Sequence, residues 1–156
     1  MILQKMKIKD NCLLYAAAMV LDIPASDLAK DIGHDGSEIW FPDHEQPERG
    51  FNIQEIVDVC FSYGKALTPV YRYPANSPDG DAHRPLWESK KADNRFLGII
   101  SGFEGILIGL TANSVRHACA WDSSIIYDPR GYQHSISDYS KRMFEITECW
   151  VISDLI

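Results

Sequence analysis

Long apolar stretches are missing from this sequence. No run approaches the ~18–20 consecutive apolar residues that a membrane-spanning helix requires. The first nine residues alternate between apolar and polar side chains and include three lysines, a pattern unlike that of a secretory signal. We therefore expect a protein with no membrane partner that stays in the cytoplasm, although export without a cleaved signal predicts the same pattern.

Cysteine is scarce and widely spaced. The sequence has no C-x-x-C pair and no histidine at zinc-ligand spacing from its four cysteines, Cys12, Cys60, Cys119 and Cys149. This spacing argues against a disulfide framework or a structural zinc ion and favours a reducing compartment. A glycine-rich phosphate loop is also missing. The one acidic segment with a histidine, at Asp79, Asp81 and His83, offers few oxygen ligands for a metal ion. We predict no cofactor and no resident metal.

Basic residues are outnumbered by acidic ones. The chain has 15 lysine and arginine residues against 22 aspartate and glutamate residues, a net charge of −7. Binding to nucleic acid or to an anionic membrane depends on lysine and arginine, so this balance argues against both partners. An acidic surface is in general a solvated face, and it also suits a protein that selects basic peptides.

Size and composition are those of an ordinary globular domain. The chain has 156 residues, of which 46% are hydrophobic and 24% charged. A chain of this length buries about two-thirds of its unfolded surface and forms a core without metal ions or disulfide bonds. We therefore expect a single domain over residues 1–156.

The order of periodic segments predicts the fold class. Helical patterns dominate the first half and strand patterns the second. The expected helices are residues 12–21, 24–32, 53–61 and 86–103, and the expected strands are residues 2–8, 66–73, 105–110, 115–121, 124–128 and 144–153. Residues 36–50 are expected to form a loop, and residues 74–81 a mobile excursion. This order is typical of an α+β fold, with helices on one side of an antiparallel sheet.

Cys12 is the first residue whose position indicates chemistry. It begins an apolar helix that Asp10 or Asn11 can cap. At a helix N-terminus, unpaired N–H groups and the positive end of the helix dipole stabilise a thiolate, which is the nucleophilic form of cysteine. The alternative is a small apolar cysteine of the core.

His117 and Asp128 are expected to meet across a hairpin. A two-residue loop at residues 122–123 makes His117 face Asp128 directly. Opposed side chains have Cβ atoms about 5 Å apart, so the carboxylate can hold an imidazole N–H. The other face of the hairpin is apolar and suits a core. The alternative is that His117 and Asp128 form a purely structural ion pair. Together with Cys12, however, they supply the nucleophile, base and orienting carboxylate of an activated-nucleophile site.

These segments resemble the papain-like thiol hydrolases, and most nearly the compact peptidases similar to the bacteriocin-leader (double-glycine) proteases. The specific stretches, in the chain order of that family, are Asp10-Asn11-Cys12 before an alanine-rich helix, His117-Ala118-Cys119-Ala120-Trp121-Asp122, and Tyr127-Asp128-Pro129-Arg130-Gly131. The resemblance implies a papain-like fold in which Cys12 is the nucleophile, His117 the general base and acid, and Asp128 its orienting partner.

One part of the family pattern is missing. The family usually carries an oxyanion-hole glutamine shortly before the cysteine, where this sequence has Met6. Gln4, two residues earlier, lies on the same side of an extended segment. Asn11 is another candidate amide donor, and the backbone N–H of Cys12 is a third. Losing such a donor costs ~10²–10³ in turnover.

Two tryptophans are candidates for a substrate cleft. Trp40 lies in the expected loop and Trp121 on the hairpin, and core packing is the alternative for both. Cys119 shares a strand face with His117 and is expected to pack in the core, as are Cys60 and Cys149.

The sequence thus predicts a thiol hydrolase that cleaves an amide bond of a peptide or protein, with peptide, isopeptide and glutamine side-chain amides as open choices. A catalytically inert papain-like binding or inhibitor module is the alternative. The missing glutamine favours that module, and the presence of all three triad residue types disfavours it. An interaction domain with coincidental residues is a third interpretation.

Overall fold

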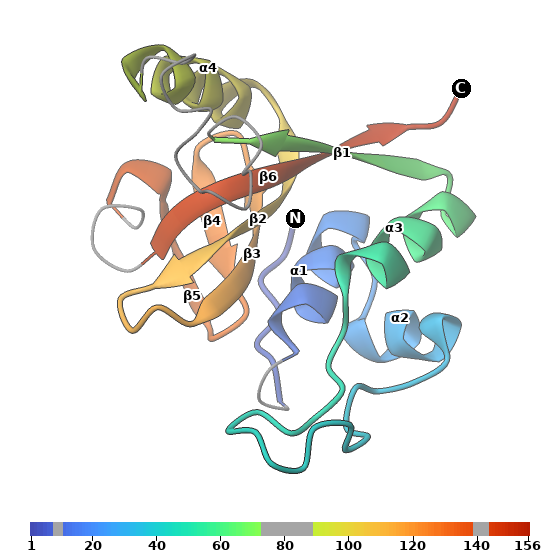
Figure 1. The fold of residues 1–156 in the computed structure, drawn as a ribbon. Helices are drawn as coiled ribbons and strands as arrows, with labels where there is room; N and C mark the ends of the chain where they lie inside the picture. The colour runs from blue at the N-terminus through green and yellow to red at the C-terminus, as the bar shows by residue number, and fades with distance from the viewer. Residues whose placement is uncertain (8–10, 73–88, 139–143) are drawn as a thin grey trace.

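The computed structural model of the chain describes residues 1–7, 11–72, 89–138 and 144–156 (Figure 1). In chain order its elements are α1 (Cys12–Leu21), α2 (Ala25–Ile32), α3 (Ile53–Ser62), β1 (Lys65–Tyr71), α4 (Ser89–Gly102), β2 (Glu104–Thr111), β3 (Arg116–Asp122), β4 (Ile125–Asp128), β5 (Tyr132–Ser135) and β6 (Phe144–Asp154). The predicted α+β class is confirmed. The expected excursion at 74–81 and the acidic segment with His83 lie outside the described residues.

The strands form one antiparallel sheet in the order β1-β6-β2-β3-β4-β5. β5 is missing from the sequence prediction because all four of its residues are exposed and show no apolar alternation. The edge strand expected over residues 2–8 is wrong for its described part, residues 2–7, which lie outside the sheet. Instead, the Met6 N–H donates to the Pro129 carbonyl at 2.7 Å.

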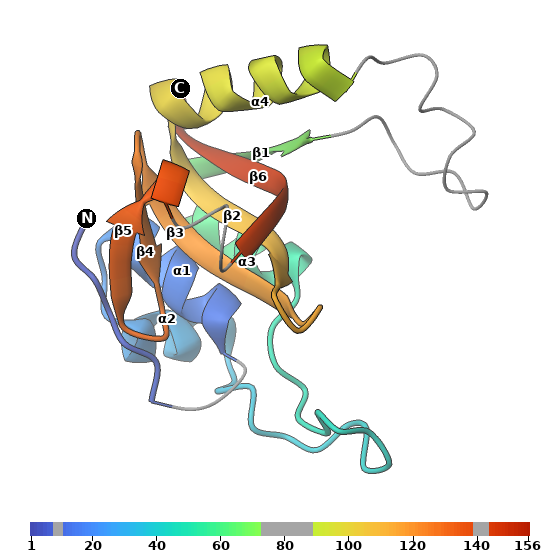
Figure 2. The same cartoon turned by 90° about the vertical axis from the view of Figure 1, so that its left-hand side faces the viewer.

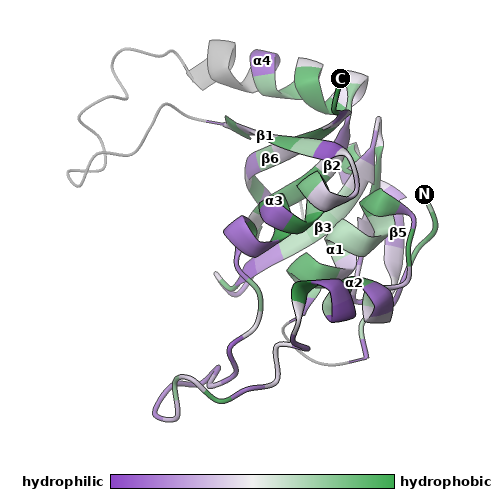
Figure 3. Cartoon of the chain, turned by 90° about the vertical axis from the view of Figure 1, so that its right-hand side faces the viewer, coloured by the Kyte–Doolittle hydropathy of each residue, from purple (hydrophilic) through white to green (hydrophobic). Residues whose placement is uncertain are grey.

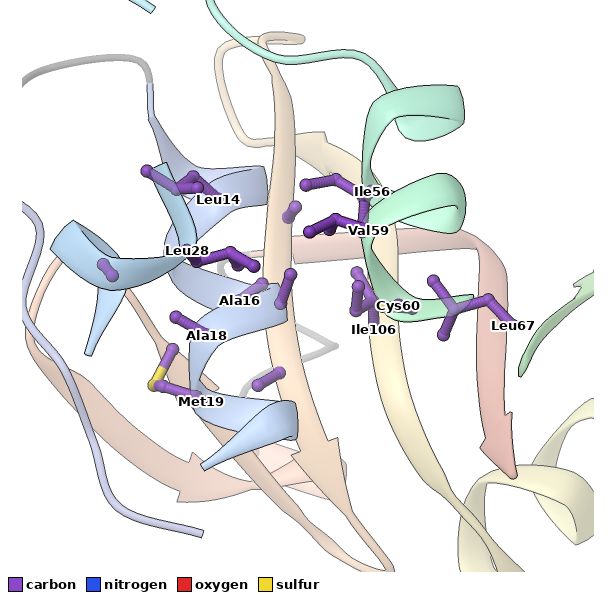
Figure 4. Close-up of a cluster of buried hydrophobic side chains, with 14 of the residues drawn as sticks. Leu14, Ala16, Ala18, Met19, Leu28, Ile56, Val59, Cys60, Leu67 and Ile106 are labelled. Atoms are coloured by element: carbon purple, nitrogen blue, oxygen red, sulfur yellow. The ribbon is translucent and has the colours of Figure 1, made fainter. Parts of the chain in front are cut away.

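Both faces of the sheet are covered. Helices α1, α2 and α3 pack against one face, where α1 contributes Ala16 and Ala18 and α3 contributes Ile56 (Figure 4). Helix α4 covers the other face, and Figure 2 shows it across the sheet from α1. There Ile100 joins a second buried cluster with Trp121. The central strands are therefore buried on both sides, and the expectation of helices on one side only is corrected by α4.

Helix α1 is the central helix of the first core. Its middle residues, Ala16, Ala17 and Ala18, are at most 1% exposed, and such small side chains let the helix approach β3 closely. By contrast, α2 and α3 carry hydrophilic residues on their outer sides (Figure 3). Within the described residues, no single helix is long and apolar enough to cross a membrane; α1 and α2 together, across a 107° bend, pass that test by length and composition.

Helix α3 begins and ends as the sequence predicts. The Asn52 side chain accepts from the Glu55 N–H, and the Glu55 side chain accepts from the Asn52 N–H, so two N–H groups of the first turn are satisfied. After the helix, Gly64 has a φ of 74°, a conformation that favours glycine. This turn leads the chain into β1.

The β3–β4 hairpin has a different register from the predicted one. Ala120 pairs with Tyr127 and Asp122 with Ile125, so the loop is Ser123 and Ser124 rather than residues 122–123. The left-handed φ of 50° at Ser123 suits such a two-residue turn. Asp128 therefore lies diagonally from His117 instead of directly opposite it. Because the shift is two residues, both side chains stay on the same face of the sheet.

A β-bulge lies beside His117 in the neighbouring strand. Gly109 of β2 pairs with His117 on one side, and on the other side the register to β6 shifts between Ile108 and Gly109. A Cβ at Gly109 would come within 2.0 Å of the Glu145 carbonyl oxygen, so the close approach of β6 requires glycine here. The bulge bends the sheet at the end where His117 lies.

Candidate active site

Cys12 opens onto a pocket at the N-terminal end of α1. Its side chain is half-buried, and α1 leaves its first N–H groups directed toward this end. We call this cavity of about 360 Å³ the thiol pocket; its described lining is Met6, Cys12, Gln46, Thr111, Asn113, Val115, Arg116, His117 and Arg130. The helix and the start of β3 thus bring Cys12 and His117 to one cavity, as predicted.

The His117 ring is held on two sides. Its exposed fraction is 6%, and its Nε2–H donates to Asp128 Oδ1 at 3.0 Å. The Phe144 ring lies edge-on to it, with centroids 5.8 Å apart. With Nε2 bound to Asp128, Nδ1 is the nitrogen left for the Cys12 side chain, which lines the same pocket and interacts electrostatically with the imidazole. The order sulfur, imidazole, carboxylate is that of an activated nucleophile.

The pKa of His117 is raised from 6.5 to about 9. Burial is the largest influence and acts to lower this pKa, because it disfavours the charged ring. The hydrogen bonds to Asp128 and to Cys12 and the negative charges of both groups act in the opposite direction and together outweigh burial. The imidazolium form is therefore favoured at neutral pH.

Asp128 is an anchored carboxylate. It is fully buried, and the Arg130 backbone N–H donates to its Oδ1 at 2.8 Å. The Arg130 guanidinium adds a fork, with Nε 3.1 Å and Nη2 2.9 Å from Oδ2. These charge-assisted hydrogen bonds hold the carboxylate in place beside the imidazole. Arg130, which the sequence indicates only within the motif that resembles the family, is thus the partner of Asp128.

Cys119 completes a buried group on the same strand face. Its thiol is fully buried, as predicted, and burial raises its pKa well above the ordinary value. Ligand atoms of Cys119, His117 and Asp128 lie within 4.8 Å of one another, close enough to hold a metal ion. The Arg130 guanidinium already binds the carboxylate, and the thiol favours its protonated form. Both features disfavour a cation at this point.

Neither predicted amide donor faces Cys12. The Gln4 side chain donates to the Ile23 carbonyl at 2.7 Å and accepts from the Ala25 N–H at 3.0 Å, so it joins α1 to α2 at the far end of α1. The extended-segment argument for Gln4 is therefore wrong, because residues 2–7 do not run as a strand toward the cysteine. The Asn11 amide is turned to the Asp35 carbonyl at 3.1 Å. It makes no cap hydrogen bond in α1 either.

The thiol pocket offers two other donors. One is the backbone N–H of Cys12, the third candidate from the sequence. The other is Gln46, an exposed residue of the loop between α2 and α3 that reaches the pocket lining. No sequence pattern indicated Gln46, because its place in the pocket lining depends on how that loop folds back.

The two tryptophans do not line the thiol pocket. Trp121 is fully buried, and its Nε1–H donates to the Ile100 carbonyl of α4 at 2.8 Å, so it is a core residue. Trp40 is exposed and stacks under the Arg49 guanidinium at 4.3 Å. The cleft assignment is thus wrong for Trp121, and Trp40 lies in the same loop as Gln46 without reaching the cavity lining.

A second cavity lies between α1 and α2. Its volume is about 510 Å³, and it includes Asn11 and Tyr15 but neither Cys12 nor His117. It is larger than the thiol pocket, yet it holds none of the three predicted triad residues. Cys12 and His117 line the smaller cavity instead.

Comparison with known proteins gives one informative similarity. No protein-family model matches the chain. The chain is similar to the "Non-structural protein of 12.7 kDa" of porcine hemagglutinating encephalomyelitis virus (strain 67N), with 32% identity over 75 residues. The aligned part covers 42% of this chain and 69% of the viral protein.

Proposed function

The chain belongs to the family of the 12.7 kDa non-structural protein of porcine hemagglutinating encephalomyelitis virus, and we propose that it is a thiol hydrolase acting on amide bonds. The description of that relative gives a size and no activity, so the proposal rests on the site. Its main support is that Cys12 and His117 line one pocket and that the His117 ring is hydrogen-bonded to the buried Asp128. The likeness to the papain-like hydrolases is part of the same proposal.

The proposed reaction has two halves. The Cys12 thiolate attacks the carbonyl carbon, and His117 gives its proton to the leaving nitrogen, which releases the amine and leaves a thioester. His117 then takes a proton from water, whose oxygen attacks the thioester and frees the acid and the thiolate. Asp128 holds the ring so that Nδ1 faces the sulfur throughout.

Stabilisation of the oxyanion is assigned to the two donors in the pocket. The backbone N–H of Cys12 lies at the start of α1, where the helix dipole also favours negative charge. Gln46 lines the pocket and supplies a side-chain amide donor, the role that Gln4 and Asn11 do not fill. The substrate is a peptide or protein, and the bond is a peptide, isopeptide or glutamine side-chain amide.

The proposed setting is a reducing compartment such as the cytoplasm. All four cysteines are free thiols, which agrees with that setting. It also suits a mechanism that depends on Cys12 remaining reduced.

A catalytically inert binding module is the rival function. The observation in its favour is that both predicted amide donors, Gln4 and Asn11, are hydrogen-bonded elsewhere. In that case the thiol pocket binds a partner and Cys12 has no activated thiolate.

Alkylation by iodoacetamide as a function of pH separates the two functions. We expect Cys12 to be alkylated well below pH 8, where an ordinary thiol with a pKa of about 8.5 is mostly protonated. The His117→Ala variant is expected to lose this low-pH reactivity, and the His134→Ala variant, changed at an exposed residue of β5, to keep it. Slow, equal alkylation of Cys12 in all three proteins contradicts the hydrolase.

A further inference from the structure

The thiol pocket carries the opposite charge from the protein as a whole. The chain has a net charge of −7, yet the charged residues described in the pocket lining, besides the catalytic pair, are Arg116 and Arg130. No carboxylate belongs to this lining among the described residues. The pocket therefore differs from the surrounding surface in the sign of the charge it presents.

Arg116 reaches the pocket from the first position of β3. It lines the thiol pocket together with Cys12 and with its strand neighbour His117. The Arg116 side chain is 75% exposed, and its Nη2 donates to Glu148 at 3.0 Å. Within the described part of the chain this is the one hydrogen-bonded partner that its guanidinium has.

The carboxylates that balance the two arginines lie behind them. Glu148 has a side chain only 11% exposed, and Asp128 is fully buried. Each arginine is thus paired with a carboxylate that lies outside the lining, while the arginine itself belongs to the lining. A cation in this position attracts an approaching anion more strongly than its buried counter-ion repels it, because the anion comes closer to the cation.

We infer that the thiol pocket selects peptides with a carboxylate close to the scissile amide, recognised by Arg116 with Arg130 beside it. This inference rests on the proposed function, because it names the substrate class of the same site. It replaces the expectation of basic substrates drawn from the net charge. Arginine suits this task since its planar donors match a carboxylate.

The test compares an anionic and a neutral alkylating reagent at Cys12. The ratio of the iodoacetate rate to the iodoacetamide rate is measured for the wild type and for Arg116→Gln, Arg116→Lys and Arg95→Gln. Arg95 is exposed on α4, across the sheet from α1, so its variant removes the same charge away from the pocket. His117 is unchanged in all four proteins, so its own attraction for iodoacetate cancels.

We expect the ratio to fall ~3- to 10-fold in Arg116→Gln, the effect of one partly screened charge a few ångströms away. Arg116→Lys should restore most of it, and Arg95→Gln should leave it unchanged. An equal ratio in the wild type and Arg116→Gln overturns the inference. The proposed function fails by a different result, low-pH iodoacetamide reactivity that does not depend on His117.

Protection of Cys12 by short peptides then identifies the source of the carboxylate. Acetylated tetraglutamate amide has side-chain carboxylates only, acetylated tetra-alanine has a terminal carboxylate only, and acetylated tetralysine amide has neither. Slower iodoacetamide reaction with one of the two anionic peptides assigns the recognised group. Protection by neither of them, or stronger protection by tetralysine, contradicts the inference.

Discussion

Asp128 shows how a buried carboxylate influences the reactivity of the imidazole beside it. It receives hydrogen bonds from His117 and from the backbone and side chain of Arg130 while being inaccessible to solvent. The positive charge of the Arg130 guanidinium lies directly beside this buried carboxylate. The imidazole then gains a fixed acceptor on one side and the sulfur of Cys12 on the other.

The Cys12→Ser variant separates reactivity from stability. Cys12 is half-buried and begins α1, where serine is well tolerated, so we expect the free energy of unfolding to change by less than about 0.5 kcal/mol. Alkylation at this position disappears, and any amide hydrolysis with it. Chemical denaturation and an activity assay check the two halves; a loss of several kcal/mol would assign Cys12 to the core instead.

Changing Asp128 to asparagine should affect stability and chemistry together. The variant removes the charge that holds Arg130 and His117, so we expect a loss of about 1–3 kcal/mol in unfolding free energy and a lower His117 pKa. Asp154→Asn is the control. That residue is 80% exposed and pairs with Lys65, so its change should cost little. Equal stability of the two variants contradicts the anchoring role of Asp128.

Some residues of this site can be predicted from the sequence and others cannot. Cys12, His117 and Asp128 were predicted from helix position and strand parity, and parity survived a hairpin register that was wrong by two residues. The position of Gln4 away from Cys12 and the position of Gln46 in the pocket lining were not predicted, because chain-end and loop packing have no periodic signal. Sequence spacing therefore predicted the positions of the three candidate triad residues better than those of the amide donors around them.

At the scale of elements, the sheet positions β3 so that α1 packs against it. Helix boundaries were predictable because caps and glycine stops are local signals, as at Asn52 and Gly64. Strand β5 was not, since hydrogen bonding to β4 forms it without an apolar face. The segment of α4 was predicted as a helix, although it contains Gly98 and Gly102. Its packing on the second face of the sheet was not predicted, because its contact with Trp121 joins residues far apart in the sequence.

The bulge in β2 gives a prediction about one element. In Gly109→Ala, the new Cβ meets the Glu145 carbonyl oxygen at 2.0 Å, so β6 must move and we expect a loss of more than about 2 kcal/mol. In Gly98→Ala, the Cβ has no neighbour within 4 Å inside α4, and we expect a gain of up to about 1 kcal/mol. Thermal unfolding of both variants checks this; similar melting temperatures would contradict the close approach of β6 at Gly109.

At the scale of the whole molecule, the charge state of His117 links the site to stability. Its pKa is about 9 in the folded protein and 6.5 in an unfolded chain, so the folded state binds the extra proton between these values. This contribution to stability is complete below pH 6.5 and is lost as the pH rises through about 9. The central helix and the sheet that bring Cys12 and Asp128 to the ring are the cause.

Unfolding measured from pH 6 to pH 9 tests this linkage. The wild type should lose stability across the window, and His117→Gln should show a flatter dependence, because glutamine has no proton to lose. The exposed His134→Gln variant should follow the wild type. Parallel curves for the wild type and His117→Gln would mean that the folded protein does not favour the imidazolium.

The account depends most on the meeting of the Cys12 sulfur with the His117 ring, and NMR titration of the His117 imidazole measures it directly. In the wild type we expect a pKa of about 9, and in Cys12→Ser a clearly lower value, since the negative charge that the sulfur contributes is gone while Asp128 remains. The same pKa in both proteins would show that the two side chains do not interact, and would contradict the proposed thiol chemistry.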